Sequence, residues 1–525
     1  MPLWPRSLHV FCASLQTAAT EWKLARRGRG PTDQDRAFKQ RIAQLHTASF
    51  WRLSGLKRGL TYERFRSSLP LRTHSDLAPV IARMVAGEPD LLVGERCALF
   101  IRSCGATTGE PRLLPLPESM LAHFQRAWRD TLLYHTVRAR HAGIFAGRHL
   151  YCGGSSRLQR ISPDGTPESF ATSLTGAIEL SLPRWMQAYC QEPGPEISAL
   201  EDWEARLSAT GKRTASRDVS LVITPPSCLR ALASAVTAAG GRGLTLERTW
   251  PNWECWIHHG MDPAPYLAEV KAELGSRTRR HEVYAAPEGI FAAQDHDQES
   301  GLRLMTDVGI FFEFLPLEAY DPSRLNQLGA KALPLAEVKP GVDYALIVTT
   351  PAGLVRHVVG DIVRFTSVRP PRLEVMGRLA HRLDLFGERV NERDLSDALM
   401  AVCRERQWKL TEFHVAPLIS RNLAGQNRGR HEWWIELQAG TVVNPTGPVL
   451  AADLDRQLGQ RCPAYAERRQ SGQLEAPYVR LVIPGVFKHW NQHRGTLGGE
   501  NKLPRCRSDR RYADELAALA QFAAD

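Results

Sequence analysis

The alternation of strand-like and helix-like segments in the middle of the chain constrains the fold more than any other feature. Val219–Ile223 has the composition of a buried strand, and Leu229–Ala239 after it has helical periodicity. The same order recurs where the strand-like Leu244–Trp250 precedes the helix-like Tyr266–Leu274. Alternation of this kind is typical of α/β proteins, in which helices cover a largely parallel or mixed sheet. We therefore predict the α/β class.

The pattern changes after residue 387, where the strand-like and helix-like segments are those of a compact α+β unit. Helical periodicity begins only near Ala37, so the basic segment before it is expected to be flexible. We therefore predict three parts, which are a basic, flexible N-terminus (1–36), a large domain (37–386) and a small C-terminal domain (387–525).

The net charge of +11 arises from 67 basic and 56 acidic side chains among 525 residues, and it is unevenly distributed. Residues 1–30 carry five basic side chains against one acidic side chain, and residues 501–512 carry the same excess. Basic and acidic residues are nearly balanced elsewhere. The sequence therefore predicts no broad face for binding nucleic acid.

Cysteine usage and hydropathy exclude further classes of protein. None of the ten cysteines belongs to a C-x-x-C pair, which argues against a zinc ribbon or a thioredoxin-like site and favours reduced thiols. No apolar run approaches the ~18 residues of a membrane span, and the N-terminus lacks the pattern of a signal peptide. We therefore expect a cytoplasmic, monomeric protein without a membrane partner.

Five segments carry residues that are suited to binding a nucleotide. The first runs from Ser103 to Pro115, where small hydroxylated residues and two glycines follow the apolar run Cys97–Ile101. Such a loop lets backbone N–H groups approach phosphate oxygens, although a solvated turn is the alternative. Its glycine spacing, with no Gly-Lys-Ser/Thr after it, distinguishes it from a P-loop.

The other four segments lie further along the chain. Glu288 follows a short strand, where a carboxylate can hold Mg²⁺, and Tyr284 in the same segment can pack against a base. Asp361 lies on an apolar strand and can accept hydrogen bonds from a ribose diol, although a structural Asp in a turn is the alternative. The fourth segment contains Arg378, and the fifth is the glycine-rich 495–505.

In this order and at these spacings, the segments resemble the Gretchen Hagen family, the auxin-responsive acyl acid–amido synthetases. This family belongs to the adenylate-forming superfamily of luciferase and the acyl-CoA ligases. Its members carry a Ser/Thr/Gly loop, a Tyr-x-x-Ser-Glu motif, a Gly-Leu-Tyr-Arg-Tyr-x-x-Gly-Asp motif and a late Asn-Gln-x-Lys-x-Pro-Arg. Here the corresponding segments read SCGATTGEPR, YAAPE, GLVRHVVGD and GENKLPR. The resemblance covers roughly residues 37–512.

The resemblance implies a fold and a reaction. The fold is a large adenylate-forming domain with mixed sheets and a β-barrel-like part, followed by a small mobile α+β domain. In the reaction, ATP and Mg²⁺ convert a carboxylic acid into an acyl-adenylate with release of pyrophosphate. An amine, expected to be an amino acid, then attacks the acyl carbon to give an amide and AMP.

The resemblance also implies roles for individual residues. Tyr284 is expected near the adenine, Glu288 at Mg²⁺ and Asp361 at the ribose hydroxyls. Arg378 is expected to contact the nucleotide. The residues expected to hold the phosphates are Ser103, Cys104, Gly105, Ala106, Thr107, Thr108 and Gly109.

Lys502 and Arg112 are the expected catalytic residues, because each brings a positive charge to the phosphates. Arg112 stands where the family often has Lys, and Cys104 and Ala106 replace residues that carry hydroxyl groups. Two alternatives therefore stay open. In the first alternative, the enzyme passes the acyl group to a thiol of coenzyme A or of a carrier protein. In the second, the chain is a nucleotide-binding relative with degraded catalysis.

Overall fold

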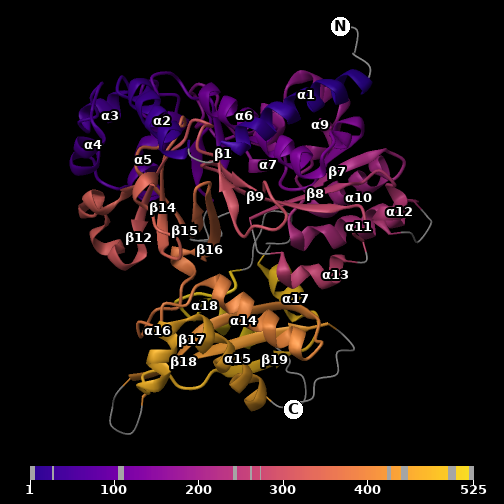
Figure 1. Ribbon diagram of the computed structural model, residues 1–525, viewed down its shortest axis with the longest axis vertical. Coiled ribbons are helices and arrows are strands. Elements are labelled where there is room, and N and C mark those ends of the chain that lie inside the picture. Colours follow the sequence, from indigo (N-terminus) through magenta and orange to yellow (C-terminus); the bar gives the residue numbers. More distant parts are fainter. Residues whose placement is uncertain are drawn as a thin grey trace. The chain divides into compact units, whose positions relative to one another are not determined.

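The computed structural model describes most of the chain, and the described residues divide into two compact units (Figure 1). The first unit holds the described residues up to Gly260 and those from Glu273 to Val375. The second holds 263–271 and the described residues from Met376 onward. The described residues are 6–26, 29–103, 111–240, 245–260, 263–271, 273–421, 427–438, 447–494 and 504–519.

The elements of the first unit follow the chain from residue 6 to β16, which continues into the second unit. Its α-helices are α1 (Arg6–Ala25), α2 (Gly30–Leu45), α3 (Ser49–Leu53), α4 (Tyr62–Ser68), α5 (His74–Val85), α6 (Glu118–Ala139), α7 (Leu174–Ser181), α8 (Arg184–Tyr189), α9 (Pro195–Ser198), α10 (Trp203–Thr214), α11 (Pro226–Gly240) and α12 (Leu246–Thr249). Its 3₁₀ helices are η1 (Gly143–Ala146), η3 (Leu317–Ala319), η4 (Pro322–Gln327), η5 (Gly329–Lys331) and η6 (Leu335–Glu337). Its strands are β1 (Leu99–Arg102), β2 (Leu113–Pro115), β3 (Arg148–Tyr151), β4 (Gln159–Arg160), β5 (Phe170–Thr172), β6 (Gln191–Glu192), β7 (Val219–Ile223), β8 (Cys255–His259), β9 (Arg279–Ala286), β10 (Gly289–Ala293), β11 (Leu302–Leu304), β12 (Phe311–Pro316), β13 (Leu333–Pro334), β14 (Asp343–Thr349), β15 (His357–Val368) and β16 (Pro371–Arg378).

The described strands of the first unit form two open sheets. The smaller has the order β2-β1-β5-β4, and the larger has the order β13-β12-β14-β15-β16-β11-β10-β9-β8-β7-β3-β6. The neighbours from β6 to β9 are parallel, whereas the pairs β9–β10, β10–β11 and β11–β16 are antiparallel. The predicted mixed α/β architecture is confirmed, and neither sheet closes into a barrel within the described residues.

The predicted alternation is present where β7, α11 and β8 follow one another, because β7 and β8 are parallel neighbours. Every residue of β7 is buried, as expected for a parallel strand that is covered on both faces. The segment Leu246–Thr249 differs, because it forms the helix α12 where the sequence predicted part of a strand. Trp250 ends this helix, and its indole N–H donates to Thr214 O at 2.8 Å, which anchors the turn to α10.

Residues 6–25, which the sequence placed in a flexible N-terminus, form helix α1 instead. Thr17 Oγ1 lies 2.8 Å from Thr136 Oγ1 on α6, and Lys23 Nζ lies 2.8 Å from Asp130 Oδ2 on the same helix. These contacts involve partners more than a hundred residues away in the chain. Local periodicity could not reveal them.

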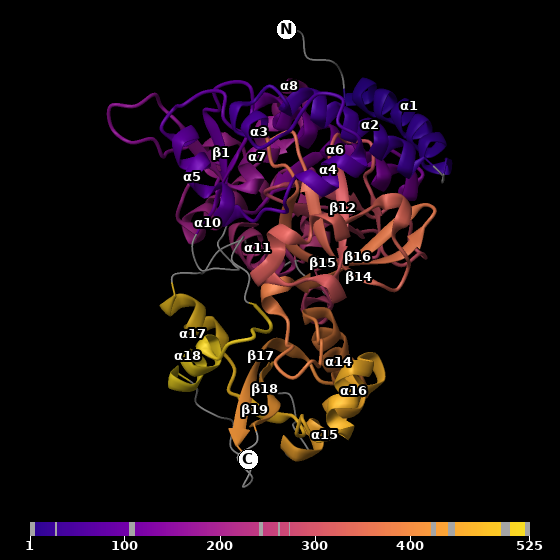
Figure 2. The same cartoon turned by 90° about the vertical axis from the view of Figure 1, so that its left-hand side faces the viewer.

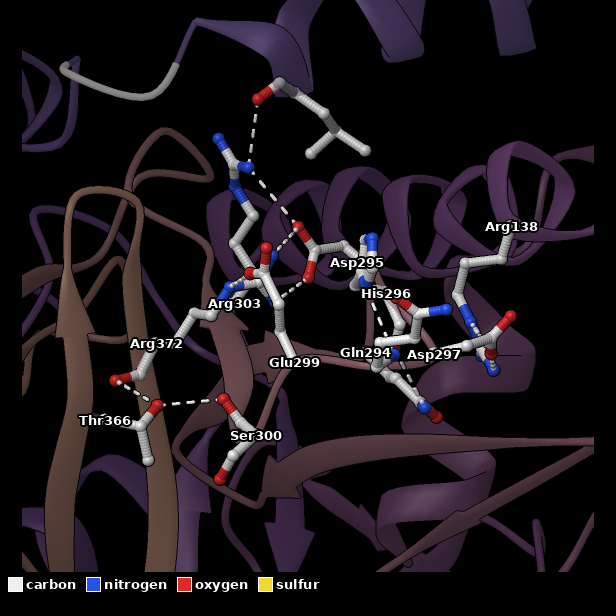
Figure 3. A network of polar contacts seen from close by, with 12 residues as sticks. Arg138, Gln294, Asp295, His296, Asp297, Glu299, Ser300, Arg303, Thr366 and Arg372 are labelled. Carbon is white, nitrogen blue, oxygen red and sulfur yellow. Dashed lines mark hydrogen bonds and ion pairs between the residues drawn. The ribbon is translucent and has the colours of Figure 1, made fainter.

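Buried charges hold the connection between β10 and β11 (Figure 3). Asp295 accepts hydrogen bonds from Arg372 on β16, with Nη2 and Oδ2 at 3.0 Å, and from Arg303 on β11 at 3.3 Å. Arg303 also donates to Leu24 O at 3.0 Å, and Arg372 pairs with Glu299 at 2.6 Å. The connection is thereby tied to β16 and to the end of α1.

A cluster of buried histidines lies at the end of α6 beside Arg138 and Asp297, which Figure 3 shows as an ion pair. Burial lowers the pKa of His135 on α6 and of His258 on β8 to about 3, and the charge of Arg138 adds to the effect. His281 lies beside them, and burial lowers its pKa as well. These side chains are therefore neutral in the folded protein and protonate near pH 6.5 when it unfolds.

The cluster predicts acid sensitivity. Because the folded pKa of His135 is depressed, the unfolded chain binds more protons below pH 6.5, and stability falls as the pH drops from 6.5 towards 3. Between pH 6.5 and pH 4.5 the unfolding free energy of the wild type should fall by about 2–3 kcal/mol more than that of His135→Phe. This corresponds to ~1.4 kcal/mol per pH unit for one extra proton bound by the unfolded chain. Urea denaturation at both pH values measures this, with the exposed His296→Asn as the control. Equal pH slopes for His135→Phe and the wild type would contradict the assignment.

The second unit contains a three-stranded sheet and its own helices (Figure 2). Its described helices are η2 (Ala264–Tyr266), α13 (Leu267–Val270), η7 (Leu379–His381), α14 (Glu392–Glu405), α15 (Gly447–Arg461), α16 (Pro463–Gln470), α17 (Val486–His493) and α18 (Arg511–Leu519). Its described strands are β17 (Leu410–Arg421), β18 (Asn427–Leu437) and β19 (Tyr478–Val482), in the order β17-β18-β19. No helix of the described residues is long and apolar enough to cross a membrane.

Helices cover both faces of this sheet. Trp433 and Trp434 are neighbours on β18 and point to opposite faces, as successive residues of a strand do. Trp433 packs in the apolar cluster with α14 and α15, and Trp434 packs in the cluster with α17 and α18. The segment 263–271 also packs here, because the Tyr266 hydroxyl donates to Glu412 Oε2 at 2.7 Å and Arg505 lies over its ring.

Candidate functional site

A hairpin brings the two ends of the predicted phosphate loop together. β1 and β2 pair in antiparallel fashion, Ser103 follows β1, and Arg112 precedes β2. The Ser103 N–H donates to Arg112 O at 2.8 Å, and the Arg112 N–H donates to Ser103 Oγ at 3.1 Å. This pair forms the neck of the loop. The predicted residues that lie outside the described part of the chain are Cys104, Gly105, Ala106, Thr107, Thr108 and Gly109.

Tyr284 and Asp361 are in direct contact in the first unit. Tyr284 lies on β9 and Asp361 on β15, and the Tyr284 hydroxyl donates to Asp361 Oδ2 at 2.7 Å. Tyr284 is 6% exposed and Asp361 is 7% exposed. An ionised carboxylate has about four acceptor positions, so this bond uses only part of the capacity of Asp361.

This contact requires the large sheet to be strongly curled. β16, β11 and β10 stand between β15 and β9 in the strand order. In a flat sheet, four spacings of ~4.8 Å would place the two strands ~19 Å apart, beyond the combined reach of a Tyr and an Asp side chain. A register shift between Ile290 and Ala292 on β10 contributes to the bend. Curvature therefore assembles this part of the site.

Glu288, in the turn between β9 and β10, faces a histidine that begins β15. His357 Nε2 lies 3.6 Å from Glu288 Oε1, and His357 is buried. His74 on α5 belongs to the same group, and its Nε2 donates to Leu113 O at 2.9 Å. Burial lowers the pKa of His74, and the positive charge of Arg112 adds to this effect. The Glu288 carboxylate, the Arg112 guanidinium and the His357 imidazole thus all interact electrostatically with His74.

A fully buried ion pair fixes the backbone that leads into β15. Arg356 Nε and Nη2 donate to Glu313 Oε2 and Oε1 at 3.1 and 2.8 Å. Its remaining donors reach the backbone oxygens of Arg66, Leu69 and Gly329 at 2.6–2.8 Å. Arg356 has a φ of 52°, in the left-handed region that arginine rarely adopts. The five hydrogen bonds hold this strained residue in place.

The first unit contains five of the residues singled out in the sequence, and Ser103 is hydrogen-bonded to Arg112. Tyr284 and Asp361 form one pair, and Glu288 and Arg112 both interact electrostatically with His74. Their roles stay predictions.

Two further predicted residues are not part of the described first unit. Arg378 ends β16 in the second unit, and Lys502 lies outside the described residues. The sequence analysis did not identify His74 or His357. His357 could have been found, because it follows Arg356 in the GLVRHVVGD motif, whereas His74 belongs to none of the motifs.

Comparisons with known proteins match the chain over three consecutive regions. Residues 30–210 match the GH3 family N-terminal domain, residues 303–378 its central domain and residues 393–511 its C-terminal domain. Together these regions cover most of the chain in the family's own order.

Curated relatives match nearly the whole length at low identity. Indole-3-acetic acid-amido synthetase GH3.8 of Oryza sativa subsp. indica is 22% identical, over 90% of this chain and 87% of the relative. Jasmonoyl–L-amino acid synthetase GH3.5 of Oryza sativa subsp. japonica is 21% identical, over 94% of both chains.

Solved structures share the fold. The GH3.15 acyl acid amido synthetase superposes with a TM-score of 0.71 at 17% identity, over 94% of both chains. A 2-hydroxyisobutyryl-CoA ligase in the postadenylation state superposes with a TM-score of 0.54 at 15% identity, over 93% of this chain and 92% of that one. With its three domains matched in order and its fold shared with an acyl acid amido synthetase, this chain belongs to the GH3 family.

Proposed function

We propose that this chain is an ATP-dependent ligase that adenylates a carboxylic acid and transfers the acyl group to an amine, expected to be an amino acid. The match to all three GH3 domains is the observation that carries this proposal. The names of the rice relatives support amide synthesis as the class of reaction. The acid and the amine of this chain stay open.

The residues of the first unit suit the adenylation step. A carboxylate oxygen attacks the α-phosphorus of ATP, pyrophosphate leaves, and negative charge develops on the phosphate oxygens. Arg112, at the neck of the phosphate loop, is suited to stabilise that charge. Asp361 is suited to accept hydrogen bonds from the ribose hydroxyls, and Tyr284 to pack near the adenine. Arg378 and Lys502 are proposed as further contacts of the nucleotide.

Glu288 is the residue proposed to hold Mg²⁺. The described residues contain no cluster of three or more His, Cys, Asp or Glu side chains that forms a closed metal cage. A single carboxylate still fits, because Mg²⁺ on nucleotides is held by one or two carboxylates together with phosphate oxygens and water. The Glu288 side chain is 12% exposed, so it is open to a ligand on one side. When bound, the ion supplies positive charge to the phosphates.

Glu288→Gln tests this role. We expect the Mg²⁺ concentration for half-maximal pyrophosphate exchange to rise at least about tenfold, because a neutral amide is a weaker ligand for a hard cation. The measurement is the exchange rate as a function of Mg²⁺ at saturating ATP. Glu63→Gln, an exposed position on α4, serves as the matched control and should leave the Mg²⁺ curve unchanged. An unaltered curve for Glu288→Gln would place the ion elsewhere.

The reaction itself is tested by carboxylate-dependent exchange of labelled pyrophosphate into ATP over a panel of aromatic, aliphatic and amino-acid carboxylates. Exchange with at least one acid supports adenylation, whereas ATP binding without exchange favours the degraded relative.

The shared fold of a CoA ligase supports a thiol acceptor as the second candidate. Amino acids and coenzyme A are therefore supplied in parallel to the pre-formed adenylate. An amide without a thioester supports the leading proposal, and a thioester alone contradicts it.

A further inference from the structure

The outer face of α1 is apolar and exposed. Phe11 is 58% exposed, Leu15 is 59% exposed and Trp22 is 60% exposed. Together with the exposed Ala18 they recur at intervals of four, three and four residues, so they lie on one face of the helix. Figures 1 and 2 both show α1 on the outside of the first unit. An exposed apolar stripe of this kind marks a surface that binds a partner.

The opposite face of α1 is attached to the first unit. Ala13 belongs to the apolar core of that unit, and Thr17 Oγ1 lies 2.8 Å from Thr136 Oγ1 on α6. The three large apolar side chains of the outer face are not part of this core. The helix is therefore held by one face, and the outer stripe is presented to the surroundings.

Exposed arginines lie beside the stripe. Arg26 directly follows α1, and its guanidinium carbon lies 3.2 Å from the centroid of the Trp22 ring. Arg126 on α6 and Arg184 on α8 are exposed and line a hollow together with Cys12 of α1. Within the described part of the chain, no carboxylate forms an ion pair with any of these three arginines. Positive charge therefore accompanies the apolar surface.

A second hollow, with a volume of about 160 Å³, lies between the end of α1 and the start of α2. Its cationic side chains are those of Lys23, Arg26, Arg29, Arg36 and Arg303, and its carboxylates are those of Asp33 and Asp307. Tyr134 lines it as well, is 2% exposed, and forms no hydrogen bond through its hydroxyl with a described residue. Since cations outnumber carboxylates, the hollow is suited to an anionic group such as a phosphate.

Charge distinguishes between two occupants of the stripe. In a symmetric dimer, α1 of one copy would face α1 of the other, and residues 1–30 carry five basic side chains against one acidic side chain. Two such segments repel each other, whereas a membrane that contains anionic lipids attracts them. Trp, Phe and Leu side chains on one face of a helix also suit the boundary between headgroups and acyl chains.

We propose that the outer face of α1 docks the protein on an anionic lipid surface. Phe11, Leu15 and Trp22 enter the boundary between headgroups and acyl chains, and the arginines beside the stripe bind lipid phosphates. The sequence prediction of no membrane partner depended on the absence of a spanning segment, and a helix that lies on the surface needs none. Docking of this kind is independent of the reaction proposed above.

Flotation of the full chain with phospholipid vesicles tests the docking. We expect at least about tenfold stronger binding to vesicles of equal parts phosphatidylcholine and phosphatidylserine than to phosphatidylcholine alone, and weaker binding as salt screens the charges. Leu15→Gln/Trp22→Gln should weaken binding at least about tenfold, because two apolar side chains no longer enter the lipid. Both positions are exposed, so the fold is kept. The matched control is Leu53→Gln, an exposed leucine on α3, which should bind as the wild type does.

Arg26→Gln/Arg184→Gln tests the contribution of charge. This variant should bind anionic vesicles at least about tenfold more weakly than the wild type and bind phosphatidylcholine as the wild type does. Arg52→Gln, which replaces an exposed arginine on α3, is the matched control and should leave binding unchanged.

No binding to anionic vesicles, equal binding to the two kinds of vesicle, or unchanged binding in either double variant would overturn the proposal. Sedimentation of the chain without lipid tests the alternative occupant. A monomer supports the proposal. A dimer that Leu15→Gln/Trp22→Gln dissociates would assign the face to a second copy of the chain and overturn it.

Discussion

Replacing Asp361 by Asn is expected to slow carboxylate-dependent pyrophosphate exchange about 10²–10³-fold. The carboxylate of Asp361 is proposed to accept hydrogen bonds from both ribose hydroxyls. Hydrogen bonds to a charged group contribute ~1.5–3 kcal/mol each, and an amide recovers only part of that because one of its two positions is a donor. The loss should appear mainly as weaker use of ATP, measured as a raised half-saturating ATP concentration together with a lower maximal rate.

The fold should tolerate this change, because Asn has the shape of Asp and its amide oxygen still accepts the bond from Tyr284. Tyr284→Phe is the matched control. It removes the same hydrogen bond from the other side and leaves the Asp361 carboxylate intact, so exchange should fall less than about tenfold. An Asp361→Asn protein that is folded and exchanges pyrophosphate at the wild-type rate would exclude Asp361 from nucleotide binding.

Arg356→Met is expected to destabilise the first unit by about 3–5 kcal/mol. The substitution leaves Glu313 buried without its cationic partner, and it also leaves three backbone oxygens without the guanidinium donors. Exchange activity should disappear at lower denaturant concentrations than in the wild type. Urea denaturation, followed by fluorescence and by exchange activity, measures both effects.

A double variant tests whether the unpaired charge of Glu313 causes the loss of stability in Arg356→Met. In Glu313→Gln/Arg356→Met no charge is left buried, so the double variant should recover about 1–3 kcal/mol relative to Arg356→Met alone. Arg324→Met, which removes an exposed arginine paired with Asp321, is the control and should change stability by less than about 1 kcal/mol. A loss below about 1 kcal/mol in Arg356→Met would show that the backbone around Arg356 relaxes freely.

Most of the architecture was predictable because it depends on local pattern. The run that became β7 is dominated by Val, Leu and Ile, and its alternation with helices indicated the α/β class. Helix α1 was not predictable, because its partners on α6 are remote in sequence. The helix α12 was missed because four residues are too few to show a period.

The residues of the candidate site that belong to a sequence motif could be predicted. The residues that only tertiary packing brings to the site could not. Tyr284, Glu288 and Asp361 were identified from motif order, and their grouping depends on the curvature of a sheet that no local pattern encodes. His74 joins the group only because α5 packs beside β2, at a distance along the chain that gives no signal. The buried pair of Glu313 and Arg356 was likewise invisible, since neither residue is identified as buried by its type.

The segment 263–271 limits how the protein can be divided into fragments. A recombinant fragment that begins at residue 376 would contain every described strand of the second unit and yet lack Tyr266. Glu412, whose pKa burial already raises, would then lose the phenol that donates to it, and the ring under Arg505 would be replaced by solvent. Such a fragment should be less stable than one in which residues 263–271 are fused to it by a linker. The fused fragment would therefore be the better isolated unit.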